Sequence, residues 1–291
     1  EICLFDLYLP KYRDTRIRRV IGTVENNEIL KEFSSKRFGL IFYLASVVSG
    51  EAEENFEKGW NVNLFSMWNF LSALKVEHLN SSRKYIPKVI FTSSIAVFGA
   101  PFPDRIDDEF LCSPQTSYGA QKASIEILIS DFSRKGFING ISLRLPTICV
   151  RPGKPNKAAS GFFSNIIREP LNGKKAYLPV DPSVRHWHAS PRSAVNFLIH
   201  AVSLETFQLE NRRSLNLPGV SCTVEEQIES LRSIAGQKAV DLIVPKKDLS
   251  IQNMVKGWPK NFSPLKASQL GFKSENNFNE IIKIFIEDDL N

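Results

Sequence analysis

The amino-acid sequence predicts an α/β protein in which a doubly wound parallel sheet carries a smaller α/β lobe toward the carboxyl terminus. Over the first 150 residues, short runs of apolar and β-branched residues alternate with longer amphipathic stretches. Buried strands that alternate with helices are typical of parallel crossovers. After about residue 150 the pattern changes, because a turn-forming loop at 151–156 is followed by helical stretches mixed with short strands.

Four runs in the first half have the composition of buried strands, and two amphipathic stretches lie between them. The expected strands cover residues 2–5, 40–44, 88–92 and 141–145, and the expected helices cover residues 53–78 and 116–134. The second of these helices is supported by apolar residues at helical spacing, namely Ile125, Leu128, Ile129 and Phe132.

The second half is expected to form a smaller lobe against the carboxyl edge of the sheet, where open α/β sheets bind their ligands. Its expected elements are helices near 160–172, 191–204 and 223–235 and a short strand at 214–217. We therefore interpret residues 1–150 as a nucleotide-binding type of domain and residues 151–291 as a lobe. Residues 180–205 are candidates to return to the main sheet.

Composition and charge argue against two classes of partner. The chain has 291 residues, of which 43% are hydrophobic and 23% charged, as in a globular protein with a substantial core. The net charge is +6, but Lys and Arg occur in scattered short pairs, so we expect no nucleic-acid partner. No apolar run approaches the roughly 18 residues that a bilayer span needs, so we expect no membrane partner.

The four cysteines lie far apart and form no Cys-x-x-Cys pair; they are Cys3, Cys112, Cys149 and Cys222. This spacing argues against a zinc site or a disulfide framework and favours a cytoplasmic protein. His186 and His188 flank Trp187, but two histidines without a nearby cysteine or carboxylate make a poor metal site. We expect no metal.

One arrangement of residues has the side chains that acid–base catalysis requires. Ser93 and Ser94 end a predicted strand, and Tyr118 and Lys122 follow at a spacing that places them on one face of the next helix. An ammonium near a phenol favours the phenolate, so Lys122 is expected to lower the pKa of Tyr118 and make it a base. Tyr-x-x-x-Lys alone is common by chance. Here the pair follows a predicted strand, two serines and a turn, and it precedes another predicted strand. This order makes a chance occurrence much less common.

In this arrangement the chain resembles the extended short-chain dehydrogenase/reductase superfamily, also described as the NAD-dependent epimerase/dehydratase family, from residue 1 to at least residue 272. The resemblance implies a Rossmann-type domain with a carboxyl-terminal substrate lobe. Ser94, Tyr118 and Lys122 fall on the superfamily's catalytic triad, with Ser93 as a possible substitute for Ser94. Residues 144–147, which include Pro146, fall on the strand and loop that flank the nicotinamide.

Two long and unusual blocks, residues 143–160 and 185–195, narrow the resemblance. They are similar to a branch that oxidises the C2 hydroxyl of a four-carbon sugar acid with NAD. The resemblance implies that Tyr118 takes the hydroxyl proton, Lys122 keeps Tyr118 anionic and Ser94 orients the reacting oxygen. Three rivals remain: a nucleotide-sugar epimerase or dehydratase, an L-threonine 3-dehydrogenase and a non-enzymatic nucleotide-binding sensor.

The cofactor implied by the resemblance is NAD. Asp6 stands at a strand end where an acidic residue binds the adenosine ribose, and its carboxylate would repel the 2′-phosphate of NADP; a simple turn aspartate is the alternative. Residues 44–46, Leu44-Ala45-Ser46, match the turn that flanks the dinucleotide, and Asn63 matches a site-organising asparagine or is a structural one. No Gly-x-x-Gly-x-x-Gly precedes Asp6, so we expect a Gly-rich strand–turn–helix upstream.

A small sugar acid also needs its carboxylate held, and an arginine can bind it with two hydrogen bonds. Arg185 is the first candidate and Arg151 the second, while Thr147 is expected to contact a substrate hydroxyl. The resemblance further implies a homodimer formed through the helix near 53–78 and the helix that carries Tyr118.

Overall fold

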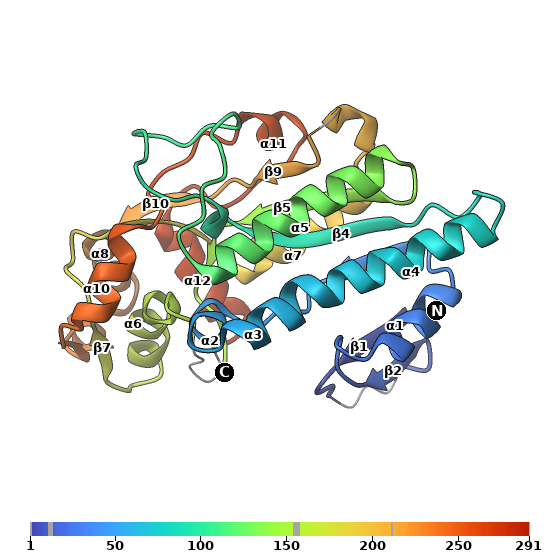
Figure 1. Cartoon of the computed structure of the whole chain (residues 1–291). Coiled ribbons are helices and arrows are strands. Elements are labelled where there is room, and N and C mark those ends of the chain that lie inside the picture. Colours follow the sequence, from blue (N-terminus) through green and yellow to red (C-terminus); the bar gives the residue numbers. More distant parts are fainter. Residues whose placement is uncertain (1, 11–13, 154–157, 211, 291) are drawn as a thin grey trace.

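A four-stranded parallel sheet forms the centre of the computed structural model (Figure 1). Its strands stand in the order β3 (Leu40–Tyr43), β4 (Lys88–Ser94), β5 (Asn139–Leu145) and β9 (Ser214–Asn216). All three neighbouring pairs are parallel, which confirms the predicted doubly wound sheet. The structure describes residues 2–10, 14–153, 158–210 and 212–290.

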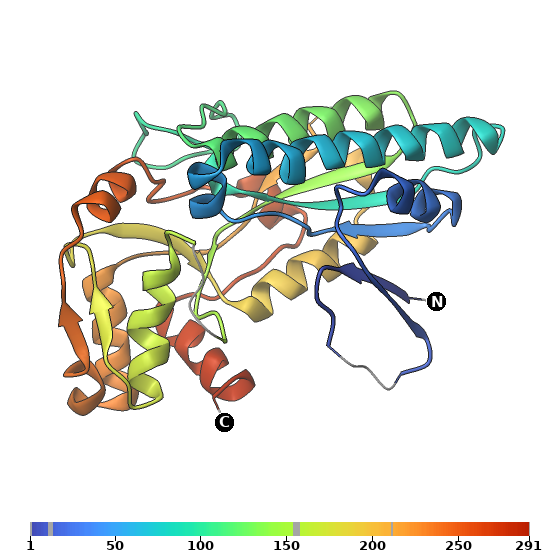
Figure 2. The ribbon, with the colours of Figure 1, turned by 60° about the horizontal axis from the view of Figure 1, so that its bottom comes forward.

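Helices cover both faces of this sheet because its central strand is apolar on both sides. Helices α4 (Ser66–Asn80) and α5 (Ser117–Arg134) lie on one face and α7 (Pro191–Ser203) lies on the other (Figure 2). Successive side chains of a strand point to opposite faces. Val89 and Phe91 of β4 therefore pack in the core under α4 and α5, while Ile90 packs in the core under α7.

The helix predicted at 53–78 is not continuous in the structure. The structure has four consecutive pieces there: α2 (Ser49–Glu54), α3 (Phe56–Gly59), the π-helix η1 (Trp60–Phe65) and α4. Asn55 interrupts the first two, since its backbone is not helical and its side chain instead accepts the backbone N–H of Lys58. A side chain that caps a helix in this way competes with continuation of the helix. The spacing of apolar residues does not reveal such an interruption.

Two further strands form a small parallel sheet of their own: β1 (Ile2–Asp6) and β2 (Ile17–Ile21). Within the described residues neither strand is hydrogen-bonded to the four-stranded sheet. Helix α1 (Asn27–Ser35) follows them and packs against α4. The expected strand at 2–5 is confirmed, whereas β2 was not predicted because Arg18 and Arg19 interrupt its apolar pattern.

The predicted helices of the second half are present as α6 (Gly161–Leu171), α7 and α8 (Val224–Ala235). The expected strand at 214–217 is β9, and it joins the main sheet beside β5 rather than the lobe. Residues 154–157, which belong to the turn-forming loop and to the block 143–160, lie outside the described residues. The remaining helices of this half are α9 (Gln237–Val240), α10 (Leu249–Lys256), α11 (Leu265–Gln269) and α12 (Phe278–Asp288), with the short turn η3 (Thr206–Leu209).

A three-stranded sheet connects the main sheet to the lobe. It has the order β10 (Val220–Thr223), β8 (Arg185–Ala189) and β6 (Thr147–Ile148). Strands β10 and β8 are antiparallel, and β6 and β8 are parallel. A further pair, β7 (Ala176–Leu178) and β11 (Ile243–Pro245), lies in the lobe. Because β6 follows β5 after one residue, the chain passes directly from the main sheet into this connecting sheet.

No helix in the described part of the chain is long and apolar enough to cross a membrane.

Candidate active site

The serine pair at the end of β4 is divided between two environments. The Ser93 hydroxyl is buried and donates to the Glu126 carboxylate at 2.5 Å, and Arg144 donates to the same carboxylate at 2.7 Å. Ser94 points the other way by strand alternation and lies at the half-buried strand end, where its hydroxyl caps the short turn η2 (Ile95–Val97) by accepting Ala96 N–H. Ser94 is therefore the serine that faces the carboxyl edge.

Tyr118 and Lys122 lie on one face of α5, as their spacing predicts. The helix begins after Thr116, whose side chain accepts Gly119 N–H at 3.1 Å. Lys122 Nζ donates to the Thr92 carbonyl at 2.9 Å and lies 5.4 Å from the centroid of the Tyr118 ring. The ammonium is thus fixed against β4 beside the face of the phenol.

The expectation that Lys122 lowers the pKa of Tyr118 below its ordinary value is wrong for the protein without bound ligands. Burial raises the pKa of Tyr118 to about 12 and lowers the pKa of Lys122 to about 7. Two groups oppose the rise at Tyr118: a hydrogen bond with the Ser46 side chain and the positive charge of Arg151. Desolvation penalises the charged form of both members of the pair, so their mutual proximity does not by itself produce a phenolate.

Asn63 joins the loop after β3 to the catalytic helix. Its side-chain oxygen accepts from Ser46 Oγ at 2.9 Å and from Val47 N–H at 2.8 Å, and its amide nitrogen donates to Gln121 Oε1 at 2.6 Å. Asn63 is 1% exposed and comes from the π-helix, which turns it inward. Asn63 thus has a structural role that extends through Ser46 to Tyr118, and its site-organising role stays a prediction.

Pro146 separates the two sheets at the site. Leu145 pairs in register with Ser94 in the main sheet, and Thr147 pairs with His188 in the connecting sheet. Proline lacks the backbone N–H that a continuing strand would use. Thr147 therefore lies just beyond the end of β5, beside the end of β4 that carries Ser94, and its Oγ1 lies 2.7 Å from His186 Nε2.

The two arginine candidates have different surroundings. Arg185 donates to Glu226 at 3.1 Å and to the Ser221 carbonyl at 3.1 Å, so its guanidinium is already occupied. Arg151 is half-buried and close enough to Tyr118 to affect its pKa. Of the residues that the structure describes, none forms an ion pair with Arg151. Burial lowers the pKa of Arg151, as expected of a cation without a counter-ion.

His186 and His188 are buried among aromatic rings. His186 is stacked on Phe163, and burial lowers its pKa to about 4. His188 Nε2 lies 2.9 Å from the side-chain nitrogen of Gln227. Among the described residues, no group of three or more His, Cys, Asp or Glu is placed to hold a metal.

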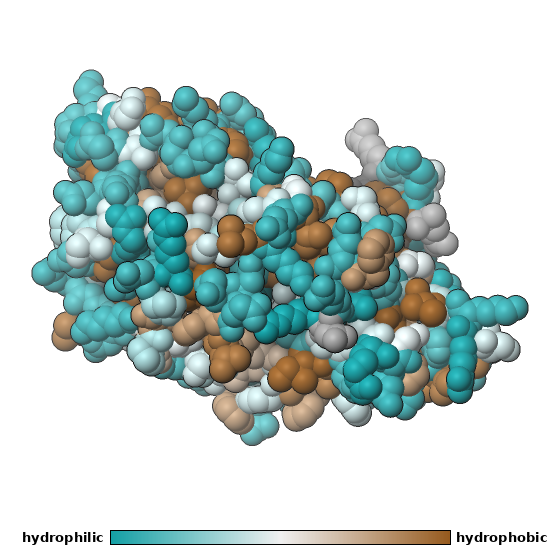
Figure 3. Space-filling view, turned by 90° about the horizontal axis from the view of Figure 1, so that it is seen from above, coloured by the Kyte–Doolittle hydropathy of each residue, from teal (hydrophilic) through white to brown (hydrophobic). Residues whose placement is uncertain are grey.

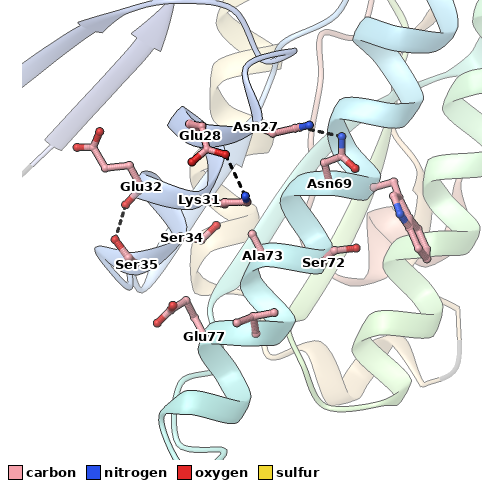
Figure 4. A pocket seen from close by; sticks show the side chains of 12 residues that line it. Asn27, Glu28, Lys31, Glu32, Ser34, Ser35, Asn69, Ser72, Ala73 and Glu77 are labelled. Carbon is pink, nitrogen blue, oxygen red and sulfur yellow. Dashed lines mark hydrogen bonds and ion pairs between the residues drawn. The ribbon is translucent and has the colours of Figure 1, made fainter.

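A surface groove of about 820 Å³ lies elsewhere, between α1 and α4 (Figure 4). Asn69 donates to Asn27 across it at 2.8 Å, and Lys31 pairs with Glu28 on its α1 side. None of its lining residues is a predicted site residue. We therefore place the candidate active site at the carboxyl edge of the main sheet, where Ser94, Tyr118 and Lys122 lie.

Comparison with known proteins now decides the family. The model of the NAD dependent epimerase/dehydratase family matches residues 9–190, which is more than half of the chain. The chain belongs to this family. It is 42% identical over 289 residues to D-erythronate dehydrogenase of Cupriavidus necator, covering 99% of this chain and 87% of that protein. It is 40% identical to D-erythronate dehydrogenase of Haemophilus influenzae, covering 100% of this chain and 91% of that protein.

Solved structures agree with this epimerase/dehydratase assignment. The crystal structure of the nucleoside-diphosphate-sugar epimerase from Agrobacterium tumefaciens has a TM-score of 0.94 and 49% identity, over 99% of this chain and 84% of that one. An L-threonine dehydrogenase from Clostridium difficile has a TM-score of 0.85 and 21% identity, over 98% of this chain and 88% of that one. The second likeness supports the Rossmann-type fold alone.

The side chains present fit the NAD of the epimerase/dehydratase family. Asp6 is exposed at the end of β1, where its carboxylate can accept from ribose hydroxyls, although one oxygen also accepts Tyr8 N–H at 3.2 Å in a turn. An ammonium has three donors, and one of those of Lys122 is used by Thr92. Leu44 is exposed directly after β3. The Gly-rich segment expected upstream of Asp6 stays a prediction.

Sequence reasoning missed two parts of the site. Gln121, fully buried beside Lys122, hydrogen-bonds Asn63, and no feature of the sequence marks it as buried. The contact between His186 and Thr147 joins residues far apart in the sequence, so no spacing pattern could have found it.

Proposed function

We propose that the protein is an NAD-dependent D-erythronate dehydrogenase. It oxidises the C2 hydroxyl of this four-carbon sugar acid to a 2-oxo acid. The relatives of that name share two-fifths of its residues over nearly the whole chain. Tyr118, Lys122 and Ser94 supply the groups that proton removal from an alcohol requires. The observation that carries the substrate class is Arg151, a half-buried guanidinium without an ion pair among the described residues, close to Tyr118.

In the proposed mechanism, Arg151 binds the substrate carboxylate and thereby places C2 beside Tyr118. Ser94 hydrogen-bonds the reacting oxygen, and Tyr118 removes its proton. The phenolate is stabilised by the charge of Arg151. NAD, when bound, accepts the hydride from C2. Lys122, Asp6 and residues 44–46 would hold its ribose groups, and Pro146 would flank its nicotinamide.

Two rival activities differ from the proposed one in their products or in their substrates. An epimerase would return the hydride to its substrate and release no net NADH, which an assay of NADH release distinguishes directly. Threonine has a carboxylate for Arg151 to bind, but its C2 carries an ammonium group, so this placement would bring an amine rather than a hydroxyl to Tyr118. A non-enzymatic sensor would have no use for Tyr118 and Lys122 together. The proposed placement of Arg151 and Tyr118 therefore favours a 2-hydroxy acid as substrate, and the assay of NADH release tests whether the oxidation is net.

We also propose a homodimer formed through α4 and α5. Phe65, Trp68 and Ile127 are exposed side chains at this face, and Leu64 and Leu128 lie beside them. Seen from above, hydrophobic side chains gather along the rim where α4 and α5 lie in Figure 1 (Figure 3). Contiguous exposed apolar surface is typical of protein interfaces.

The spaced cysteines, with Cys149 and Cys222 buried and not in disulfides, support a cytoplasmic location.

A substrate panel tests the proposed function. Purified protein is incubated with NAD and, separately, D-erythronate, other four-carbon aldonates, L-threonine and UDP-sugars, while NADH absorbance is followed. We expect NADH release with D-erythronate and none with the UDP-sugars. NADH release with L-threonine alone, or conversion of a UDP-sugar without NADH, would reject the proposal.

A further inference from the structure

The hydrogen bond between Thr147 and His186 has a direction that the surrounding contacts fix. His186 Nδ1 lies 2.8 Å from the Pro259 carbonyl, which can only accept, so Nδ1 must carry a proton. Burial lowers the pKa of His186 to about 4, so the ring is neutral near pH 7 and Nε2 carries no proton. At 2.7 Å the hydroxyl of Thr147 must therefore donate to Nε2.

This direction determines what Thr147 can offer to a substrate. A threonine hydroxyl has one proton and two lone pairs, and the proton is used by His186. Thr147 Oγ1 makes no other hydrogen bond with the described residues. It can therefore only accept a further hydrogen bond. An ionised carboxylate also only accepts, so Thr147 cannot bind the carboxylate of a sugar acid and can bind a hydroxyl group.

The arrangement is rigid as well as directional. The His186 ring is stacked on Phe163 at 5.2 Å between centroids and also contacts the ring of Trp258 at 5.2 Å. The register of β6 on β8 fixes the backbone of Thr147 beside His188. A ring that is hydrogen-bonded through both nitrogens and packed on its faces has little freedom to rotate.

We propose that His186 is a positioning residue that makes Thr147 a hydrogen-bond acceptor for a substrate hydroxyl other than the one that reacts. The site thereby selects polyhydroxylated 2-hydroxy acids over simple 2-hydroxy acids. This inference rests on the proposed function, because it assumes that the reacting hydroxyl lies at Tyr118 and the carboxylate at Arg151.

The test compares two substrates that differ only in the extra hydroxyls. These are D-erythronate and the 2-hydroxybutanoate of the same C2 configuration. The measured quantity is the ratio of their kcat/KM values. We expect Thr147→Val to reduce this ratio by about tenfold to a hundredfold, the effect of leaving a buried substrate hydroxyl without a partner. Thr147→Ser keeps the hydroxyl and should preserve the ratio. A merely structural role would lower both kcat/KM values equally.

Two variants of His186 test the positioning step. His186→Phe keeps an aromatic ring but offers no acceptor, and it should reduce the ratio. His186→Gln can place an amide oxygen near the former Nε2 and should restore much of it. Both variants leave the Pro259 carbonyl without its donor, so that structural cost is common to both. In a Thr147→Val background, His186→Phe should have little further effect on the ratio.

An unchanged ratio in Thr147→Val would overturn the inference, whether or not the His186 variants fold. An equal loss in His186→Phe and His186→Gln would overturn the positioning role. If the wild-type protein does not oxidise D-erythronate, the proposed function has failed. The ratio is then measured with whichever hydroxy acid is oxidised and with its deoxy analogue, so the two failures remain distinguishable.

Discussion

Lys122 Nζ lies 5.4 Å from the centroid of the Tyr118 ring while it donates to the Thr92 carbonyl at 2.9 Å. Lys122, the proposed catalytic cation, is therefore held by the backbone of β4 rather than by the phenol oxygen. Because burial raises the pKa of Tyr118 and lowers that of Lys122, the charge that favours the phenolate comes from Arg151. The same arginine thus serves two proposed purposes, binding the carboxylate and favouring the base.

Replacing Tyr118 by Phe is expected to lower kcat for D-erythronate by roughly 10²-fold to 10⁴-fold, the contribution of a positioned general base. Folding should be spared, because Phe keeps the aromatic ring of this half-buried side chain. The assay is NADH absorbance, with the melting temperature measured beside it. Tyr177→Phe, at an exposed tyrosine of β7, is the matched control and should retain full activity. Near-normal turnover in Tyr118→Phe would remove tyrosine from the mechanism.

The strands and the catalytic helix could be predicted because they depend on local patterns. Apolar β-branched runs and the spacing of Tyr118 and Lys122 are visible without any tertiary contact. The interrupted helix around Asn55 and the exit of Pro146 into a second sheet depend on side-chain hydrogen bonds and on competing strand partners. The direction of the Tyr118 pKa depends on burial, which no spacing reveals.

The choice between the two arginines depends on tertiary contacts for the same reason. The sequence makes Arg185 the first candidate and Arg151 the second. Only tertiary structure shows that Arg185 is paired with Glu226. Residues 44–46 and Asn63 were expected near the cofactor, and the structure adds that Ser46 and Asn63 are hydrogen-bonded to each other.

Arg151→Met is expected to raise KM for D-erythronate by roughly tenfold to a hundredfold, the effect of losing charge-assisted hydrogen bonds to a carboxylate. It should also move the rising limb of the dependence of kcat/KM on pH to higher pH, because Tyr118 must lose its proton to act as the base and a charge that lowers its pKa is gone. Steady-state kinetics across pH provide the measurement. Arg185→Met, which breaks a surface pair, should change KM little. A larger effect from Arg185→Met than from Arg151→Met would reverse the assignment.

The stability of the protein without ligands should rise between about pH 7 and pH 9. The pKa of Lys122 is about 7 in the folded protein and 10.5 ordinarily, so in this range the unfolded chain binds the additional proton. Stability rises with pH wherever the unfolded state binds more protons. Above pH 9 the raised pKa of Cys149 has the opposite sign. Urea unfolding at several pH values measures the slope.

Lys122→Met should flatten that slope, while the same replacement of the exposed Lys135 should leave it unchanged. Equal slopes in wild type and Lys122→Met would show that another group controls the dependence on pH.

Asn63→Ala should destabilise the protein by about 2–4 kcal/mol, because it leaves Val47 N–H, Ser46 and Gln121 without their partner in a buried site. Chemical denaturation provides the free energy of unfolding. Asn69→Ala removes an exposed asparagine hydrogen bond on α4 and is expected to cost within about 0.5 kcal/mol. If the two variants were equally stable, the network around Asn63 would not hold the loop to the helix.

Ile127→Asp should convert the proposed dimer into a monomer. Ile127 is 71% exposed on α5 beside Leu128 and Trp68, so a charge there disturbs no core of the single chain. Burying an unpaired carboxylate in an interface is strongly unfavourable, and the association should weaken by orders of magnitude. Light scattering coupled to gel filtration gives the mass of each variant. Ile199→Asp, at a residue that is 63% exposed on α7, is the matched control and should remain dimeric. A wild-type protein with the mass of one chain at micromolar concentration would exclude this interface.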